Sequence, residues 1–336
     1  MDNKKLNIAK IADLAGVSTA TVSRVINKYP YVKEETRKKV MEVIDETNYR
    51  INAIARNLRR RKTHSIGVII SNVLSPFYSI IAKSVEDVAI RHNFSTVLCN
   101  GGDDPLKERM YLKVLHENRV DGIILSPTGK NKDYLSFLKS LGTPILFLDR
   151  VVEGVSCDSV VVNNREAACS GVKYMIEKGC RKIGFISGPR DRMTGMHRLE
   201  GYRDALEQSG MGVKEELIKY GDFSLESGRE KAAELLMNSG IDSLFVANTD
   251  MATGAYQSIK ENNLHIPQDI AFMMFDNPGW ASLVTPGITA ISQPVYTLGS
   301  TAADLLFKRI TEAENYMDSG PVKVVLEAKL VIRQSV

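Results

Sequence analysis

The sequence predicts an N-terminal all-α headpiece with a helix-turn-helix and a hinge helix, followed by an α/β domain of two doubly wound parallel-sheet subdomains. Two observations predict this fold class. The first 50 of the 336 residues carry helical patterns only, whereas from Ser65 onward apolar strand-like runs alternate with helical stretches. Continuous apolar strands separated by helices are typical of parallel sheets that are covered on both faces. The number of strand and helix units indicates two such sheets.

The first predicted helix lies directly before a tight turn. Ile8, Ile11 and Leu14 recur at helical spacing and form one apolar stripe. Asn7 can cap the start of this helix, and Gly16 can adopt the positive φ that ends it. The stripe is therefore expected to face the rest of the headpiece.

The second predicted helix follows the turn and is capped by Ser18. Val22, Val25 and Ile26 share one of its faces, and small or hydrogen-bonding side chains lie opposite. Such side chains suit the edges of bases in the major groove, and Arg24 is able to contact guanine bidentately. The candidate base-reading residues are Ser18, Thr19, Ala20, Thr21, Ser23, Arg24 and Asn27. Two packed helices without a role in DNA binding are the alternative interpretation.

A third helix is expected at 34–47, with Val40, Val43 and Ile44 facing the first two helices. Four basic residues near its start can contact phosphates: Lys33, Arg37, Lys38 and Lys39. Residues 1–62 contain 15 Lys and Arg against 7 Asp and Glu, and the remainder contains 29 against 33. A basic end on an acidic body is typical of proteins that bind the nucleic-acid backbone, although a solvated basic arm has the same composition.

The sequence lacks the features that are typical of several other classes of protein. The chain has no apolar run of about 18 residues and no visible signal peptide, so we expect a cytoplasmic protein without a membrane partner. Its four cysteines and five histidines show no metal-binding spacing, so we expect neither a metal nor a cofactor. An enzyme on the same α/β body is the rival interpretation, but the GxGxxG, GxxxxGK[ST] and GxSxG motifs are absent.

A basic linker, residues 51–63, joins the two predicted parts. Asn52 can cap a short helix that ends near Arg60, and this helix is too short to be stable alone in water. Leu58 lies among arginines and has no core to enter. It is therefore either a wedge for the DNA minor groove or an incidental apolar residue of the linker.

The elements of the α/β domain follow from apolar runs and helical periodicity. Strands are expected at 66–70, 95–99, 122–125, 144–148, 160–162, 183–186, 244–247 and 271–275. Helices are expected at 77–91, 105–117, 133–141, 165–178, 198–208, 224–238 and 251–261. Further on, we expect a crossover strand at 288–293, a helix returning to the first subdomain at 294–310 and the last strand at 322–332. The predicted domains are 1–50 for the headpiece, 51–63 for the linker, 64–162 with 294–321 for the first subdomain, and 163–293 with 322–336 for the second.

Polar and aromatic side chains follow several of the predicted strands. Ligands of doubly wound folds bind at the carboxyl ends of strands, which here face the cleft between the two subdomains. Facing Arg and Asp side chains can hold hydroxyl groups bidentately, and aromatic rings can stack on a sugar or a base. For any single residue, a loop salt bridge or a helix cap is the alternative.

Residues 14–27, Leu-Ala-Gly-Val-Ser-Thr-Ala-Thr-Val-Ser-Arg-Val-Ile-Asn, resemble the headpiece of the lactose/galactose repressor family of bacterial regulators. The resemblance extends over the rest of the chain and implies a periplasmic-binding-protein-like effector domain. It further implies a homodimeric repressor that reads a pseudo-palindromic operator DNA. In the hinge, it implies minor-groove contacts by Asn52, Ala55, Leu58 and Arg59.

The resemblance also implies a small-molecule effector, for which we expect a sugar or sugar derivative in preference to a purine. The implied effector-binding residues are Phe77, Tyr78, Asp149, Arg150, Asn163, Arg192, Thr194, Arg198, Phe223, Asn248 and Asp276. The chain departs from the family pattern at several positions. Lys33 stands where Ser is usual and Ile51 where Pro is usual. Asn163 replaces an acidic residue of the purine-binding relative, and Ala-Asn-Thr-Asp at 247–250 replaces the usual Ala-Asn-Asp.

Overall fold

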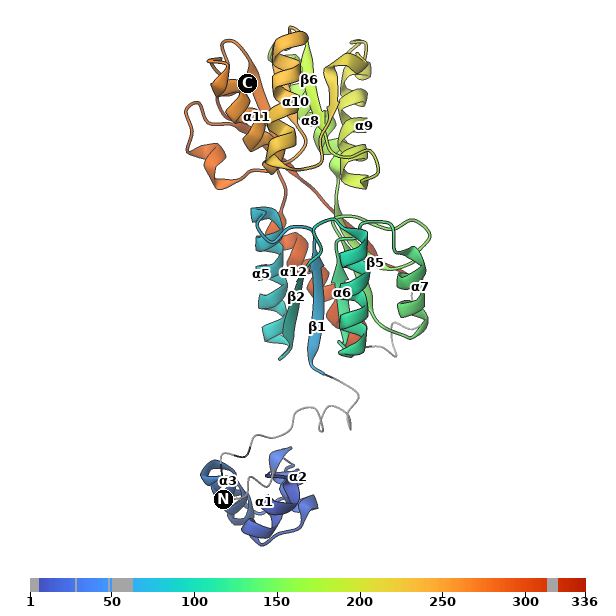
Figure 1. Ribbon diagram of the computed structural model, residues 1–336, viewed down its shortest axis with the longest axis vertical. Helices are drawn as coiled ribbons and strands as arrows, with labels where there is room; N and C mark the ends of the chain where they lie inside the picture. Colours follow the sequence, from blue (N-terminus) through green and yellow to red (C-terminus); the bar gives the residue numbers. More distant parts are fainter. Residues whose placement is uncertain (1–5, 28, 48, 50–62, 313–319) are drawn as a thin grey trace. The chain divides into compact units, whose positions relative to one another are not determined.

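The computed structural model describes residues 6–27, 29–47, 49, 63–312 and 320–336 (Figure 1). The chain forms two compact units, Met1–Lys62 and Thr63–Val336. The predicted hinge contacts Asn52, Ala55, Leu58 and Arg59 lie outside the described residues. Within the described parts of the chain, no helix is long and apolar enough to span a bilayer.

The headpiece contains three helices, α1 (Ile8–Ala15), α2 (Thr19–Ile26) and α3 (Glu34–Glu46). The predicted caps of the first two are confirmed. Asn7 Oδ1 accepts a hydrogen bond from Lys10 N at 3.0 Å, and Ser18 Oγ accepts one from Thr21 N at 3.1 Å. Gly16 ends α1 with φ 64°, and α3 begins without a side-chain cap because Lys33 has no acceptor to offer.

The headpiece core differs from the predicted stripe on α1. Ile11, Ala12 and Ala15 are buried, whereas Ile8 is 37% exposed and Leu14 is 50% exposed. The physical reason is that α1 contacts both α2 and α3, so its buried face is centred between two neighbours. On the other helices, Val22, Val25, Val40 and Ile44 complete the core as expected.

We call the two halves of Thr63–Val336 the first and the second lobe. The first lobe contains a six-stranded sheet of order β11-β5-β4-β3-β1-β2. Its strands are β1 (Ser65–Ile70), β2 (Ser95–Asn100), β3 (Gly122–Leu125), β4 (Ile145–Leu148), β5 (Asp158–Val162) and β11 (Lys323–Leu326). Every pairing in this sheet is parallel.

Helices cover both faces of the first sheet (Figure 1). They are α5 (Pro76–Arg91), α6 (Pro105–Glu117), α7 (Lys132–Ser140) and α12 (Val295–Thr311). Side chains of α5 and α12 share one core cluster with the sheet, and those of α6 and α7 share another. The sheet is therefore the middle layer of three, and its strand ends are left free to form a site.

The second lobe repeats this topology, with sheet order β12-β10-β9-β8-β6-β7. Its strands are β6 (Ile183–Ser187), β7 (Ile218–Tyr220), β8 (Ser243–Val246), β9 (Ala271–Phe275), β10 (Thr289–Ser292) and β12 (Lys329–Val331). Its α-helices are α8 (Asn164–Glu177), α9 (Met193–Gln208), α10 (Leu225–Asn238) and α11 (Thr249–Glu261), and two short 3-10 helices, η1 (Glu215–Leu217) and η2 (Gly279–Ser282), complete it. Only the pairing of β12 with β10 is antiparallel among those described in this sheet.

The predicted last strand at 322–332 requires a correction, as does its assignment to the second subdomain. Lys323–Leu326 pairs with β5 in the first lobe, and Lys329–Val331 pairs with β10 in the second. One extended segment thus supplies an edge strand to each sheet. The break between the two strands is held by Asn163, whose Oδ1 accepts a hydrogen bond from Ala328 N at 2.9 Å.

The other predicted strands and helices of the α/β domain are present, with shifted ends. Helix α9 begins five residues before the predicted Arg198, so its first turn reaches the carboxyl end of β6. The prediction missed β7, a strand of three residues. β7 is the edge strand of the second sheet and contains a single buried residue, Ile218, so the sequence marks it weakly.

Candidate effector cavity and DNA-reading surface

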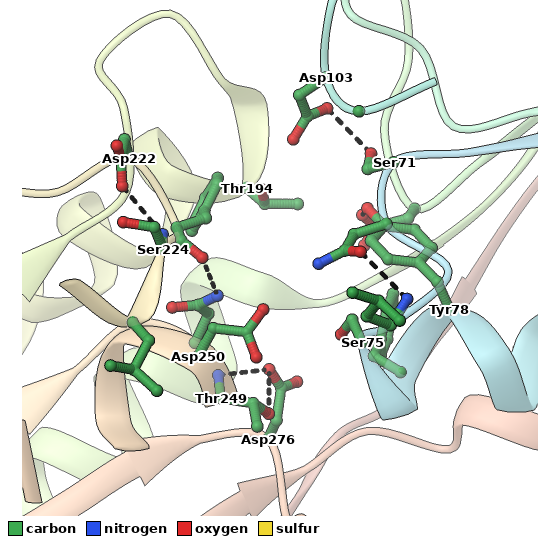
Figure 2. Close-up of a pocket in the computed structure, with 18 of the residues that line it drawn as sticks. Ser71, Ser75, Tyr78, Asp103, Thr194, Asp222, Ser224, Thr249, Asp250 and Asp276 are labelled. Carbon is green, nitrogen blue, oxygen red and sulfur yellow. Dashed lines mark hydrogen bonds between the residues drawn. The ribbon is translucent and has the colours of Figure 1, made fainter. Parts of the chain in front are cut away.

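A cavity of about 490 Å³ lies between the two lobes, at the carboxyl ends of their strands. Figure 2 shows Ser75 and Tyr78 of the first lobe facing Thr249, Asp250 and Asp276 of the second. Nine of the predicted effector residues line it: Phe77, Tyr78, Asp149, Arg150, Thr194, Arg198, Phe223, Asn248 and Asp276. The structure therefore brings residues from distant parts of the chain to one site.

Two aspartates occupy equivalent positions in the two lobes. Asp149 follows β4 and Asp276 follows β9, and their φ angles are 66° and 73°. Their amides donate across the sheet to Val160 O and Ile291 O, both at 2.9 Å. Left-handed backbone outside glycine is sparsely populated and gathers at functional sites. In both lobes this turn directs a carboxylate toward the cavity.

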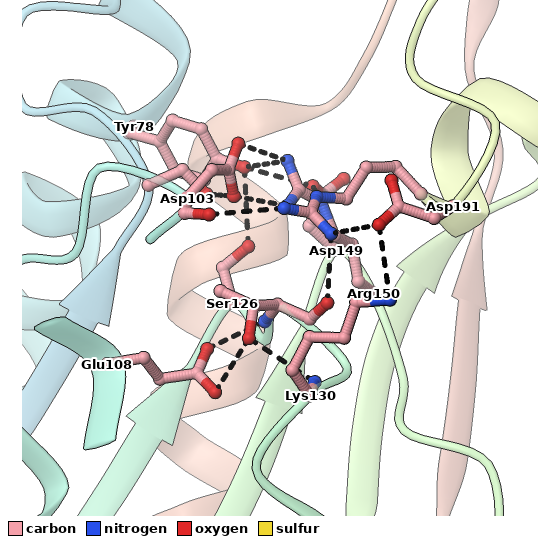
Figure 3. A network of polar contacts seen from close by, with 11 residues as sticks. Tyr78, Asp103, Glu108, Ser126, Lys130, Asp149, Arg150 and Asp191 are labelled. Atoms are coloured by element: carbon pink, nitrogen blue, oxygen red, sulfur yellow. Dashed lines mark hydrogen bonds and ion pairs between the residues drawn. The ribbon is translucent and has the colours of Figure 1, made fainter. Parts of the chain in front are cut away.

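A buried polar network surrounds Asp149 (Figure 3). Arg150 donates from Nη1 to Asp103 Oδ1 at 2.6 Å and from Nη2 to Tyr78 Oη at 3.2 Å. Tyr78 Oη in turn donates to Asp149 Oδ2 at 3.3 Å. The network joins the ends of β2 and β4 to helix α5, and it fixes the cavity wall of the first lobe.

Burial and charge act against each other in this network. Burial raises the pKa of the Asp149 carboxyl, and the attraction of Arg150 and Arg198 only partly offsets that effect. Burial would also raise the pKa of Asp103, but Arg150, together with Ser71 and Arg192, holds the pKa below the ordinary value. Burial disfavours the charge on Arg150 as well, yet Tyr78, Asp103 and Asp149 together raise its pKa. The guanidinium is therefore a permanent charge whose partners are already in place.

In the second lobe, Arg198 lies on α9 and is 4% exposed. Its Nε donates to Asn164 Oδ1 at 2.7 Å and its Nη1 to Ala247 O at 2.5 Å. The guanidinium carbon also lies 3.7 Å from the centroid of the Phe275 ring. Packing and hydrogen bonds thus fix the position of the Arg198 guanidinium, which also lines the cavity.

Asp276 is held at the start of α11. Its Oδ2 accepts hydrogen bonds from both N and Oγ1 of Thr249 at 3.2 Å, and its Oδ1 accepts one from Gln293 Nε2 at 2.5 Å. Asn248 caps the same helix by accepting from Met251 N at 3.1 Å. The start of α11 and the strand end of β9 therefore form one rigid cavity wall.

Three buried polar atoms of the cavity lining have no hydrogen-bond partner in the described structure: Asp149 Oδ1, Gln293 Oε1 and Arg150 Nε. Buried polar groups are almost always hydrogen-bonded, because an unpaired one costs about 1–3 kcal/mol. Two acceptors and one donor in the cavity wall are therefore unsatisfied, and the donor, Arg150 Nε, lies 3.6 Å from Asp149 Oδ2.

Two predicted effector residues do not line the cavity. The side chain of Asn163 bonds to Ala328 N, as described above, so it holds two crossing segments together. Arg192 reaches from the second lobe to the first, where its Nη1 donates to Thr128 O and its Nη2 to Asp103 O, both at 3.1 Å. Both side chains are hydrogen-bonded to other segments of the protein.

The cavity also contains residues that sequence reasoning missed. They include Ser71, Asn100, Asp103 and Gln293. Asp103 is the third residue of the loop after β2, and Gln293 lies at a crossover between the lobes. Their positions after β2 and β10 were the available signal, since both follow strands whose carboxyl ends reach the cleft.

On the headpiece, the candidate base-reading residues separate into two groups. Thr19, Ala20 and Arg24 are exposed, and the Arg24 side chain has no partner among the described residues. The hydroxyl of Ser18 is used in the cap of α2, where it also bonds to Thr21 Oγ1 at 2.9 Å.

The remaining two candidates lie at the end of α2. Asn27 Nδ2 donates to Ser23 O at 2.7 Å, and both residues are half-buried. Among the basic residues near α3, Lys33, Lys38 and Lys39 are exposed, whereas Arg37 donates to Tyr29 O at 2.9 Å. The exposed part of α2 therefore offers Thr19, Ala20 and Arg24 to a partner.

The fold and the site define a class of protein: a two-lobed small-molecule receptor attached to a helix-turn-helix unit. Comparisons with known proteins agree with this class. Residues 7–52 match the family described as bacterial regulatory proteins, lacI family. Residues 63–328 match the family described as periplasmic binding proteins and sugar binding domain of LacI family. The chain belongs to the LacI family of bacterial regulators.

Individual relatives match along nearly the whole chain. The ribose operon repressor of Escherichia coli K12 is 36% identical over 304 residues, which cover 90% of this chain and 92% of that protein. The structure of the transcriptional regulator CelR–cellobiose complex has 30% identity and a TM-score of 0.74, with 99% and 100% covered. The Lac repressor dimer bound to operator and the anti-inducer ONPF has 27% identity and a TM-score of 0.84, with 99% of each chain covered. The chain is thus a DNA-binding transcription regulator and not an enzyme.

Proposed function

We propose that this regulator is a repressor of sugar-utilisation genes, which binds a pseudo-palindromic operator as a homodimer and responds to a sugar or sugar derivative in its cavity. The observation that carries the proposal is that two inward-facing aspartates, Asp149 and Asp276, line the cavity together with Arg150 and Arg198. Carboxylates accept hydrogen bonds from neighbouring hydroxyl groups, and guanidinium groups donate to hydroxyl and ring oxygens. A molecule rich in hydroxyl groups complements such walls.

Aromatic side chains give the cavity a second feature of carbohydrate sites. Phe77 and Phe223 are half-buried and line it, so their ring faces can cover the apolar face of a sugar ring. The Arg150 guanidinium lies 5.9 Å from the Phe223 ring centroid. A purine could stack on the same ring, and it is the second candidate effector.

Exposed apolar side chains on the first lobe support a dimer. Strand β2 is the edge of the first sheet, and its Val97 and Leu98 are 42% and 45% exposed. On α5, Ile80 and Ile90 are exposed as well, and Leu74 is exposed in the preceding loop. An edge strand with neighbouring apolar residues is a surface that proteins normally cover. A second copy of this chain would bury it and place two headpieces on one operator.

The proposal is tested by a thermal-shift screen of the purified full chain against sugars, sugar phosphates, purine bases and nucleosides. A ligand at 100 times its Kd stabilises the protein by about 2.7 kcal/mol, which is well within the range of the method. The best ligand is then added to a gel shift with operator DNA. A sugar that both stabilises the protein and changes operator binding is the expected result. Stabilisation by purines alone would contradict the sugar assignment.

A further inference from the structure

The cavity between the lobes contains more carboxylates than cations. Its lining includes five aspartates, Asp103, Asp149, Asp222, Asp250 and Asp276. It includes two arginines, Arg150 and Arg198, and no lysine among the described residues. Charges that share a cavity with low-dielectric walls act on the charge of any ligand that enters it.

Both arginines are already engaged by the protein. Arg150 forms a buried ion pair with Asp103 at 2.6 Å, with side-chain exposures of 6% and 28%. Arg198 donates to Asn164 and to Ala247 O and lies against Phe275. Arg150 is thus paired with a carboxylate, whereas the hydrogen-bond acceptors of Arg198 are neutral and its charge is balanced only by the carboxylates of Asp276 and Asp149.

At the cavity, backbone amides at the N-termini of α10 and α11 already donate hydrogen bonds to side-chain oxygens of the protein. A helix N-terminus otherwise favours an anion, because its first amides are unpaired and its dipole is positive there. On α11, Asp276 accepts from Thr249 N and Asn248 accepts from Met251 N. On α10, Ser224 Oγ accepts from Ser227 N at 3.1 Å.

Asp250 differs from the other carboxylates of the lining. It lies in the first turn of α11, is half-buried, and has no hydrogen-bond or ion-pair partner among the described residues. Figure 2 shows its carboxylate on the cavity side of α11, beside Asp276. Burial, and then the nearby Asp276, raise the pKa of Asp250. Among the described residues, no side chain pairs with this charge, and only the start of α11 offsets it.

The unpaired buried atoms indicate what the cavity requires instead. Asp149 is 3% exposed and Gln293 is 7% exposed, and each has an acceptor oxygen without a partner. Unsatisfied acceptors in the wall favour a ligand with donor hydroxyl groups over a phosphate dianion, which has only acceptor oxygens. The unsatisfied acceptors and the excess of carboxylates in the cavity therefore both favour an uncharged ligand with hydroxyl groups.

We propose that the cavity takes an uncharged carbohydrate and rejects its phosphorylated or acidic forms, and that Asp250 is the specificity-determining residue for this choice. The inference rests on the proposed sugar-responsive function. It deepens that function by naming the charge class of the effector and the side chain that sets it. An anion entering the cavity would meet five carboxylates against two arginines, and Asp250 has no cationic side chain paired with it among the described residues.

The test uses the sugar that gives the largest thermal shift in the screen above. Calorimetry on the full chain compares the binding of this sugar and of its phosphate ester. Three variants are measured beside the wild type. Asp250→Asn removes the charge with little change of shape, and Asp250→Glu keeps the charge. Asp304→Asn removes an exposed charge on α12, outside the cavity, as the matched control. Operator binding by gel shift reports that each variant is folded.

We expect the wild type to bind the phosphate ester at least tenfold more weakly than the free sugar. Asp250→Asn should reduce this ratio by about tenfold, because one repulsive charge is lost. Asp250→Glu and Asp304→Asn should keep the wild-type ratio. Equal or tighter binding of the phosphate ester by the wild type would overturn the inference while leaving a sugar effector intact. An unchanged ratio in Asp250→Asn would overturn the role of Asp250. A screen in which purines bind and sugars do not would overturn the proposed function itself.

Discussion

At the scale of single residues, the headpiece separates side chains that build it from side chains that it presents. The hydroxyl of Ser18 and the amide of Asn27 are used in capping and in contacts within α2. Arg24 remains exposed and unpartnered among the described residues. A guanidinium on the exposed side of the second helix of a helix-turn-helix is placed to read a base.

Arg24→Ala should therefore lower operator affinity by about 1–3 kcal/mol and relax the base preference at one position of each half-site. Lys38→Ala is the comparison, because Lys38 is exposed near the start of α3 and is a candidate phosphate contact. Its loss should weaken binding to every sequence and reduce the salt dependence. Gel shifts on operator variants and on random DNA distinguish the two effects. An equal loss on operator and random DNA for Arg24→Ala would refute a base-reading role.

A second prediction concerns Asp103 and the pH dependence of stability. The Arg150 guanidinium holds the pKa of Asp103 below its ordinary value, against the opposing effect of burial. A carboxyl whose pKa is depressed by folding stabilises the protein fully above its unfolded pKa, and loses that contribution as the pH falls through its folded pKa. Asp103→Asn should lower the free energy of unfolding by about 1.5–3 kcal/mol at pH 7.

Thermal unfolding between pH 3 and 7 measures this effect. The difference in Tm between wild type and Asp103→Asn should be constant from pH 7 to about pH 5, and should shrink below about pH 4. Asp133→Asn is the control, because the Asp133–Arg109 pair is exposed and such pairs contribute little. A Tm difference that grows in acid would show that the pair with Arg150 is not its source.

At the scale of elements, the loop before α9 connects the two lobes at the mouth of the cavity. Arg192 donates to Thr128 O and to Asp103 O in the other lobe, and Lys130 pairs with Asp191 at 3.3 Å (Figure 3). The acceptor loop is itself rigid. Glu108 is 1% exposed and accepts hydrogen bonds from Thr128 N at 2.6 Å and from Asn131 Nδ2 at 2.8 Å. These contacts hold the two lobes in the arrangement that the structure shows.

Arg192→Ala should consequently weaken effector binding by up to roughly 150-fold, because the variant lacks two hydrogen bonds between the lobes from a charged donor, each contributing about 1.5 kcal/mol or more. Arg190→Ala provides a matched control from the same loop. The Arg190 guanidinium lies 4.0 Å from the Tyr220 ring centroid, within the second lobe. Calorimetry should show near-wild-type affinity for Arg190→Ala. The same loss in both variants would mean that general disruption of the loop, and not the loss of hydrogen bonds between the lobes, explains the effect.

At the scale of the whole molecule, alternating apolar strands and helices were sufficient to predict two doubly wound lobes. Local pattern could not assign Lys323–Leu326 and Lys329–Val331 to different sheets, because strands of three or four residues carry no mark of their partner. The same limit applies to the site. Residues such as Asp149 and Asp276 follow strongly apolar strands and could be predicted, whereas Gln293 joins the cavity only through the crossover of the chain between lobes.

The repetition of one topology in both lobes also suggests how an effector signal begins. Each lobe presents an aspartate after its fourth strand, so a ligand that bonds to both favours one arrangement of the lobes. A ligand shifts such an equilibrium only by its difference in affinity for the two states. Arg198 and Asp276 lie in the second lobe and contribute nothing to the headpiece core.

Arg198→Ala and Asp276→Asn should therefore still bind operator but fail to respond to the effector. Each change leaves polar groups of the buried ligand unpaired, at a cost of about 1–3 kcal/mol, or roughly 5- to 150-fold in Kd. Arg165→Ala is the control, because Arg165 pairs with Asp204 on the surface and does not line this cavity. If the effector is an inducer, both variants repress permanently, whereas with a co-repressor they lose repression. Calorimetry for the effector beside gel shifts with and without it thus also determines the sign of regulation. Wild-type effector affinity in both variants would place the binding site elsewhere.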